Sequence, residues 1–376
     1  MKLVKARVQN FKSVEDSGEF TLQEDITCLV GKNEAGKTAL LTALYRTNPV
    51  FDSEFDREAD YPRRYLSDFD ERHPDGTALV VTTWWTLEAH ELAAIETTLG
   101  PGAVTSNEVE VTRSYGKKPS TWTVKFDQSA IVKHLLNEAE LHAEEREALA
   151  PAQTLSALRE KIGDPAEDSP RLAALANRLD EVAPKANPYQ AFWKLVELPK
   201  FMLFSQYQRM QGQVSLAELA RKKANNSLDG DDQVFLALCA MAGTTVEEVA
   251  KIDRFETLVS KFEGASNKIS QVIFKYWTQN RHLKVNFRCD PAQPGDPPPF
   301  NTGHIIRTRI ENRLHEATVP FDQRSTGFVW FFSFLALFSD VKRQHKGQLI
   351  LLLDEPGLSL RTRSRPCHAR NGALAA

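Results

Sequence analysis

The sequence has little of what marks secreted, zinc-binding or membrane-spanning proteins. Cysteine is scarce, with four residues among 376, and no two of them form a CxxC pair. This scarcity argues against a disulfide framework and a structural zinc site, so a reducing compartment is expected. The first residues, MKLVKARVQNF, lack the apolar core of a signal peptide, and the most apolar stretch, 327–338, is too short to span a bilayer. We therefore expect a cytoplasmic protein with no membrane partner.

Charge of one sign is not in excess either. The chain has 47 Lys and Arg residues against 50 Asp and Glu residues, a formal net charge of -3, so no global positive field draws it to nucleic acid. Local runs such as Arg221-Lys222-Lys223 leave two interpretations open, a basic patch or the solvated face of a helix, and the second is the more usual. Charge alone therefore assigns no partner.

The strongest local signal is an octapeptide that matches the phosphate-binding pattern GxxxxGK[ST]. It consists of Gly31, Lys32, Asn33, Glu34, Ala35, Gly36, Lys37 and Thr38. The apolar run 26–30 before it predicts a buried central strand, and the leucines after it predict a helix over 37–45. Glycines let the backbone wrap phosphates, and amides at a helix N-terminus point toward them. Lys37 would bring charge to the β- and γ-phosphates and Thr38 a hydroxyl to Mg²⁺, which predicts binding of ATP with Mg²⁺.

A second signal lies at 349–355. The apolar run 349–353 predicts a fully buried strand that ends in Asp354 and Glu355. In open α/β folds, ligands bind at this end of the strands. Asp354 would hold Mg²⁺ through water, and Glu355 would act as the general base that polarises the attacking water. Taken alone, the run is also compatible with a strand that merely ends in acids, but the P-loop upstream favours the catalytic interpretation.

A third signal, Gln323-Arg324-Ser325-Thr326-Gly327, opens an apolar segment, 327–341, that predicts a helix. In ABC-type dimers a Ser-x-Gly at a helix N-terminus contacts the γ-phosphate bound by the opposite subunit. The Ser325 hydroxyl, the Gly327 amide and the helix dipole suit that contact. The alternative is an ordinary N-cap, which most Ser-Thr-Gly triplets are. The place of the triplet between the P-loop and Asp354 favours the phosphate contact.

The remaining pattern predicts an antiparallel β-lobe and a helical insertion of about 128–197 beside the nucleotide-binding part. Alternating and strand-forming residues predict strands at 3–11, 20–22, 78–87, 109–111, 121–126, 198–204, 283–288 and 305–309. Helical periodicity predicts helices over 131–183, with a break at 163–170, and over 231–242 and 245–279. The range 48–75, rich in Asp, Arg and Pro, predicts an exposed loop. No internal repeat and no sustained coiled coil is evident.

These motifs carry a resemblance to a known family. Asn10-Phe11-Lys12-Ser13 resembles the opening of RecF/SMC-type ATPases. The runs 198–212, 321–334 and 352–360 together resemble the ATPase half of the OLD (overcoming lysogenization defect) family, and the resemblance covers residues 1–360. It implies an α/β P-loop NTPase fold, an ABC-type ATPase head with a mixed central sheet, which forms a homodimer through the heads. Family members couple this ATPase to a C-terminal Toprim nuclease, and several act in phage defence or DNA processing, which implies DNA as a partner.

The resemblance also implies roles for individual residues. The ATPase motifs would be Walker A at 31–38, the signature at Ser325 to Gly327, Walker B at Asp354 with Glu355, and a D-loop at 357–360. A Q-loop glutamine is expected among Gln206, Gln208 and Gln211, and the sequence does not choose between them.

After Leu360 the sequence departs from the family pattern. The family continues with His-Ala-x-x-Gln, a long helix and a strand with a switch histidine, and the Toprim acids follow. Residues 361–376 are instead basic and then Ala/Gly-rich, which we interpret as an aberrant or disordered tail after a truncation or a reading-frame change. His368 lies in this tail and is not expected to be the switch histidine. No Toprim metal site is expected here, so a nuclease would come from a separate partner chain.

Two hypotheses of different classes follow. The first is an ATP-hydrolysing subunit that serves DNA transactions, with hydrolysis weakened by the departure after Leu360. The second is a catalytically incompetent fragment of an ATP-dependent endonuclease, which acts as an ATP-binding and dimerisation module. A RecF/SMC-like repair clamp is disfavoured because no long coiled-coil arm is evident.

Overall fold

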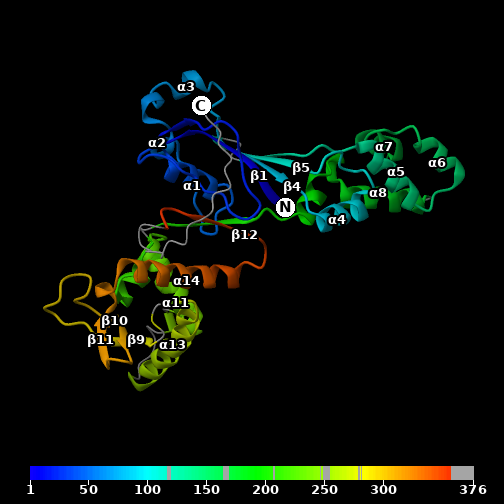
Figure 1. The fold of residues 1–376 in the computed structure, drawn as a ribbon. Coiled ribbons are helices and arrows are strands. Elements are labelled where there is room, and N and C mark those ends of the chain that lie inside the picture. The colour runs from blue at the N-terminus through cyan, green and yellow to red at the C-terminus, as the bar shows by residue number, and fades with distance from the viewer. Residues whose placement is uncertain are drawn as a thin grey trace, which may run out of the picture. The chain divides into compact units, whose positions relative to one another are not determined.

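The computed structural model describes residues 1–116, 120–163, 169–205, 208–245, 247–248, 255–277, 280 and 282–356. These residues form two compact units, residues 1–202 with 347–350, and residues 203–346 with the described part of 351–376. The chain therefore passes between the units three times, within β7 (Lys200–Phe204), at residues 346–347, and within β12 (Leu349–Leu353). Figure 1 follows the chain through both units. None of the helices in this part of the chain is long and apolar enough to cross a membrane.

The first unit is built on a six-stranded antiparallel sheet of described residues. The strands are β1 (Lys2–Phe11), β2 (Val14–Asp16), β3 (Phe20–Thr21), β4 (Ala78–Thr86), β5 (Glu108–Tyr115) and β6 (Ser120–Thr123). The order is β2-β1-β4-β5-β6, and β3 also pairs with β1. Alternation buries Ala6, Val81 and Trp85, and α1 (Lys37–Tyr45) packs against β1 and β4. The predicted antiparallel strands and the helix after the P-loop are confirmed.

The predicted buried strand before the P-loop is wrong. Residues 26–30 belong to no strand, and Ile26 and Val30 are 76% and 93% exposed. A strand exists through hydrogen bonds to a neighbour. Both edges of β1 are already paired, one with β4 and the other with β2 and β3. A single mixed central sheet is also not present, because the part of the chain that the structure describes forms three separate sheets.

The range 48–75 is more ordered than the exposed loop that its composition predicted. It contains α2 (Arg57–Asp60), the 3₁₀ turn η1 (Arg63–Tyr65) and α3 (Phe69–Arg72). Tyr61 and Phe69 are buried because their rings pack edge to face with each other and with Tyr115 on β5. Asp60 is buried and forms an ion pair with Arg46, the residue just after α1. Aromatic packing and this ion pair thus hold the segment in place within the first unit.

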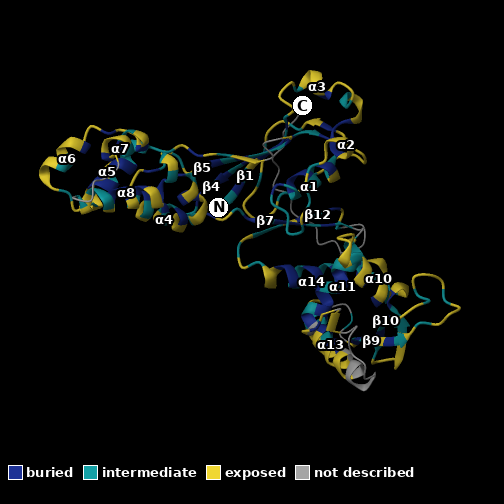
Figure 2. Ribbon diagram, turned by 180° about the vertical axis from the view of Figure 1, so that it is seen from behind, coloured by how far each residue is buried: buried dark blue, intermediate teal, exposed yellow. Residues whose placement is uncertain are grey.

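Helices occupy the range in which the helical insertion was predicted. After α4 (Ala89–Leu99) come α5 (Gln128–Glu138), α6 (Ala143–Leu149), α7 (Leu155–Ile162), α8 (Pro170–Val182), η2 (Pro184–Ala186) and α9 (Tyr189–Leu195). Leu135, Leu158 and Leu179 are buried between them, and Figure 2 shows the exposed residues on their outer sides. α7 ends and α8 begins at the two ends of the break predicted at 163–170, where Pro170 starts the second helix, and residues 164–168 of that break lie outside the described residues.

The second unit combines a four-stranded antiparallel sheet of described residues with helices. β10 (His304–Asn312) pairs with β8 (Gln213–Ser215), β9 (Leu283–Pro291) and β11 (Ala317–Pro320). The helices are α10 (Leu216–Ala224), α11 (Gly230–Ala242), α13 (Phe255–Tyr276) and α14 (Thr326–Gln344). The turn η3 (Phe321–Gln323) precedes α14. The N–H groups of Val285 and Phe287 on β9 donate to the hydroxyls of Ser270 and Ser266 on α13. α13 thus covers the outer edge of β9, and α14 packs against α11 and α13.

β7 and β12 pair with each other. The N–H of Lys200 donates to the carbonyl oxygen of Gln348 at 3.1 Å, and the N–H of Asp354 donates to that of Phe204 at 3.0 Å. Both strands advance in the same direction between these bonds, so they run parallel. The strand predicted at 349–353 is therefore present, but it is only partly covered. Leu351 is 38% exposed, whereas the sequence predicted full burial.

Candidate nucleotide-binding site

The P-loop connects the exposed segment 26–30 to α1 in the first unit. Gly36 is the N-cap of α1 and has φ +86°, a left-handed conformation that glycine adopts without strain. A Cβ at this position would lie 3.1 Å from Val14 Cγ2 and 3.5 Å from Ser13 Oγ. The loop therefore lies against the residues that follow β1. Sequence reasoning gave Ser13 only as part of a family resemblance, and no local signal marked Val14 as a residue that contacts the loop.

Lys37 folds back over the loop. Its ammonium group donates to the carbonyl oxygens of Gly31 at 2.9 Å and Lys32 at 2.8 Å. One positive charge is thus held across the turn, while residues 31–35 are exposed to solvent. The first amides of α1 have no acceptor within the helix and carry the positive end of its dipole. The charge and the amides both attract anions, so the geometry fits phosphate groups.

Thr38 lies beside Lys37 on the first turn of α1. It is exposed, and its carbonyl oxygen accepts a hydrogen bond from the Thr42 hydroxyl at 2.7 Å. A threonine hydroxyl is a hard oxygen donor of the kind that Mg²⁺ takes. The residue predicted to bind the metal on the P-loop side is therefore accessible to solvent.

Asp354 and Glu355 follow β12 in the second unit. Asp354 is 8% exposed, and its N–H bond to Phe204 fixes it at the carboxyl end of the strand pair. Glu355 is exposed and has φ +50°, so the chain turns directly after Asp354. The two carboxylates therefore leave the strand in different environments. A buried carboxylate suits a cation that neutralises it, and an exposed one suits contact with water.

Ser325 is the N-cap of α14, as the alternative interpretation of the Ser-Thr-Gly triplet predicted. Its hydroxyl accepts the N–H of Phe328 at 3.4 Å, a long and weak capping bond. Gly327 is buried in the first turn, and the Arg324 guanidinium lies 5.2 Å from the centre of the Phe328 ring. A capping hydroxyl at the start of a 19-residue helix is also suitably placed for an anion. The phosphate contact stays a prediction.

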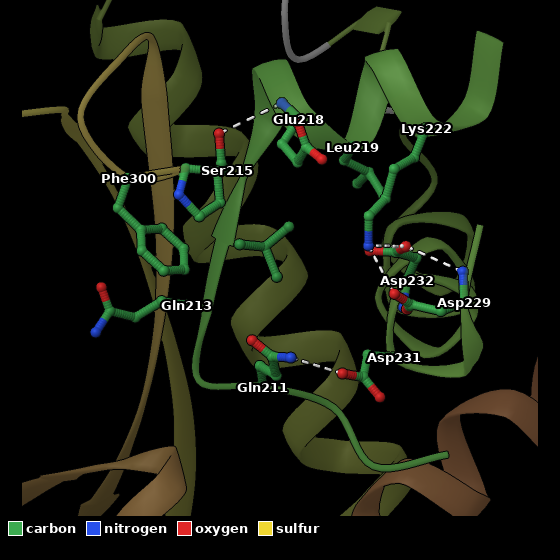
Figure 3. A pocket seen from close by; sticks show the side chains of 12 residues that line it. Gln211, Gln213, Ser215, Glu218, Leu219, Lys222, Asp229, Asp231, Asp232 and Phe300 are labelled. Atoms are coloured by element: carbon green, nitrogen blue, oxygen red, sulfur yellow. Dashed lines mark hydrogen bonds and ion pairs between the residues drawn. The ribbon is translucent and has the colours of Figure 1, made fainter. Parts of the chain in front are cut away.

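The Q-loop glutamines are only partly described. Gln208 accepts the N–H of Ser205 through its own side chain at 3.0 Å, so it closes a local turn. Gln211 donates to Asp231 at 2.7 Å, beside a cavity of about 80 Å³ (Figure 3). This cavity is too small for a nucleotide. Gln206, the D-loop range 357–360 and His368 with its tail lie outside the described residues.

The basic run on α10 is not a free positive patch. Each of its cations has an acidic partner within 2.8 Å: Arg221 pairs with Glu218, Lys222 with Asp229 and Asp232, and Lys223 with Glu247. Hydrogen bonds from the ammonium to Asp229 and then Asp232 raise the pKa of Lys222 (Figure 3). The run is therefore a neutralised helix face and gives no evidence for nucleic-acid binding.

Comparison with known proteins bears on the first part of the chain. A family model described as the AAA ATPase domain matches residues 1–70, which contain β1, the whole P-loop and α1. No curated protein matches the chain. The matched range ends before Ser325 and Asp354, so it bears on the P-loop alone. Residues 1–70 are thus similar to an AAA ATPase domain, and this similarity supports nucleotide binding and ATPase chemistry at the P-loop.

Proposed function

We propose that the chain is an ATP-binding and ATP-hydrolysing subunit with an ABC-type head of the OLD kind, which dimerises through its heads and acts in DNA processing or phage defence. The observation that carries this proposal is the GxxxxGKT turn into α1, with Lys37 held across it, inside the range similar to an AAA ATPase domain. DNA and a separate nuclease chain are the proposed partners.

The proposed chemistry distributes its roles over the motif residues. Lys37 and the first amides of α1 bind the β- and γ-phosphates. Thr38 and, through water, Asp354 would hold Mg²⁺, which supplies neutralisation of phosphate charge when bound. Glu355 accepts the proton of the attacking water, and Ser325 with Gly327 would contact the γ-phosphate bound by the partner subunit.

Isothermal titration with ATP and Mg²⁺ tests the P-loop. We expect Lys37→Ala to lose measurable binding, because two or more charge-assisted bonds at about 1.5–3 kcal/mol each correspond to a hundredfold or more in affinity. Lys32→Ala is the matched control, since Lys32 contributes its backbone carbonyl and not its side chain to the loop contacts. Unchanged affinity in Lys37→Ala would contradict the assignment.

Light scattering with and without ATP tests the assembly. Glu355→Gln should slow hydrolysis and accumulate an ATP-dependent dimer, and Ser325→Ala in the same background should dissolve it. A monomer under every condition would argue against the head-to-head dimer. Binding of a fluorescent DNA duplex, measured at two salt concentrations with and without ATP, then tests the proposed nucleic-acid partner.

A second candidate function is an ATP-binding and dimerisation module without turnover. One observation favours it: among the described residues, 26–30 form no strand and Ile26 and Val30 are exposed, so no strand anchors the start of the P-loop. Single-turnover hydrolysis separates the two functions. Phosphate release that disappears in Glu355→Gln supports the ATPase, and tight ATP binding without release supports the module.

A further inference from the structure

Gly212 is the point at which the chain after β7 meets the turn that leads into α14. Its N–H donates to Asp322 Oδ1 at 2.7 Å, and its carbonyl oxygen accepts the N–H of Thr308 on β10 at 2.7 Å. Both polar groups of this one residue are therefore used, one toward η3 and one toward the sheet. A carboxylate acceptor makes the first of these bonds a strong one.

In the observed arrangement the Asp322 carboxylate occupies the place that a side chain on Gly212 would take. A Cβ on Gly212 would lie 2.2 Å from Asp322 Oδ2, 2.8 Å from its Cγ and 3.1 Å from its Oδ1. All three nearest atoms belong to Asp322, so a side chain at position 212 would have to displace this one carboxylate, and the backbone of Gly212 is not left-handed. The two residues, 110 positions apart, fit each other as a pair.

Asp322 is in turn tied to Ser325. Phe321, next to it, is fully buried, and its ring contacts those of Phe328 and Phe332 on α14. The N–H of Arg324 donates to the Phe321 carbonyl oxygen at 3.0 Å, which closes the turn directly before Ser325. A shift of Asp322 therefore moves the residue that begins α14.

The same stretch of chain has a second attachment to α14. The N–H of Met210 donates to the buried Ser333 hydroxyl at 2.9 Å, and that hydroxyl donates to the carbonyl oxygen of Val329. Gln211, between the two attachments, reaches Asp231 on α11 (Figure 3). One hydrogen bond before the first residue of α14, at Asp322, and one within the helix, at Ser333, together fix the position and the rotation of α14.

We propose that Asp322 is a positioning residue that, by holding the N–H of Gly212, orients the Ser325 hydroxyl and the first amides of α14 toward an anionic oxygen of a bound nucleotide. The inference rests on the proposed role of Ser325 as a phosphate contact. In this proposal the residues after β7 and the start of α14 move as one body. A displacement of residues 210–212 is therefore transmitted to Ser325 through the Asp322 carboxylate.

Four variants test this: Asp322→Ala, Asp322→Asn, Gly212→Ala and the double variant Gly212→Ala with Asp322→Ala. Asp322→Ala should lower kcat for ATP hydrolysis and weaken the ATP-dependent dimer by roughly tenfold or more, because a misplaced contact group of this kind costs up to about a hundredfold. The dissociation constant for ATP should stay within about twofold, since the P-loop lies in the other unit. Asp322→Asn keeps an oxygen acceptor and should restore most of kcat.

The double variant distinguishes a positioning role of Asp322 from a general destabilisation of the fold. Gly212→Ala alone should be as defective as Asp322→Ala, because its Cβ collides with the carboxylate. The double variant should be no worse than Asp322→Ala alone, because the colliding atoms are gone. Additive losses in the double variant, or wild-type kcat and dimerisation in folded Asp322→Ala, would overturn the proposal.

Amide hydrogen exchange separates this proposal from the proposed function. Exchange at residues 325–328 should accelerate in Asp322→Ala and not in Asp322→Asn, while exchange in α1 stays unchanged. If the wild-type chain hydrolyses no ATP, the ATPase assignment fails, and the exchange result still decides whether Asp322 positions the start of α14. Unchanged exchange there refutes that role.

Discussion

Substitution of Gly36 by alanine should weaken ATP binding more than it weakens the fold. Gly36 has φ +86°, and an L-residue in the left-handed region costs about 1–2 kcal/mol. The added Cβ would also lie 3.1 Å from Val14 Cγ2, so the loop has to shift. If the alanine variant relieves this strain by leaving the left-handed conformation, phosphate binding must restore that conformation. The same 1–2 kcal/mol then appears as a dissociation constant about 5- to 30-fold higher.

Gly18→Ala is the matched control for this substitution. Gly18 has φ +62°, and a Cβ there meets nothing within 4 Å, so the variant carries the backbone cost without the steric one. It lies between β2 and β3, outside the P-loop. We expect a similar loss of unfolding free energy, about 1–2 kcal/mol in urea titration, with unchanged ATP affinity.

A second substitution separates the two costs at Gly36. Val14→Ala removes the methyl group that the new Cβ would meet, so it should restore part of the ATP affinity when combined with Gly36→Ala. Calorimetric titration of the single and double variants measures this directly. Wild-type ATP affinity in Gly36→Ala, with a stability loss equal to that of Gly18→Ala, would refute the reasoning.

Three further outcomes are expected. Asp60→Asn should lower the unfolding free energy by about 3–5 kcal/mol in urea titration, because it leaves the Arg46 guanidinium without the buried negative charge that neutralises it; a loss below 1 kcal/mol would contradict this. Burial raises the pKa of the Cys239 thiol to about 12. At pH 8 a thiol reagent should therefore label exposed Cys28 and label Cys239 only after unfolding, as peptide mapping can show. Burial lowers the pKa of His73, so folding favours its neutral form; stability should fall as pH drops below about 6.5, and His73→Gln should flatten this slope in urea titrations at pH 5.5 and 7.5.

The local parts of the site were predictable from sequence because their conformation is decided by neighbouring residues. The glycines and Lys37 of the P-loop and the helix that follows depend on residues within one turn of one another. The segment 26–30 failed for the opposite reason. Its apolar composition suits a strand, but a strand also needs hydrogen bonds to a neighbouring strand, and both edges of β1, the first strand of the unit, are taken by other strands.

Burial and pairing over long distances in the chain could not be predicted. Tyr61 and Phe69 turn an apparently polar loop into part of the core because Tyr115, far along the chain, receives their rings. The contact of Gly212 with Asp322 joins residues 110 positions apart, and although both lie in runs that resemble the OLD family, nothing in the sequence pairs the one with the other. A single sequence shows which residues can pack or bind, and only the fold shows which of them meet.

The first unit also has a consequence for synthesis of the protein on the ribosome. It is discontinuous: Gln348 contacts Lys200 and Glu88, yet it is made only after the intervening second unit. At about 5–20 residues per second, roughly 145 intervening residues delay its completion by about 7–30 s. During that interval the nascent chain exposes β7 without β12, so the emerging P-loop unit needs protection from premature association until the last strand arrives.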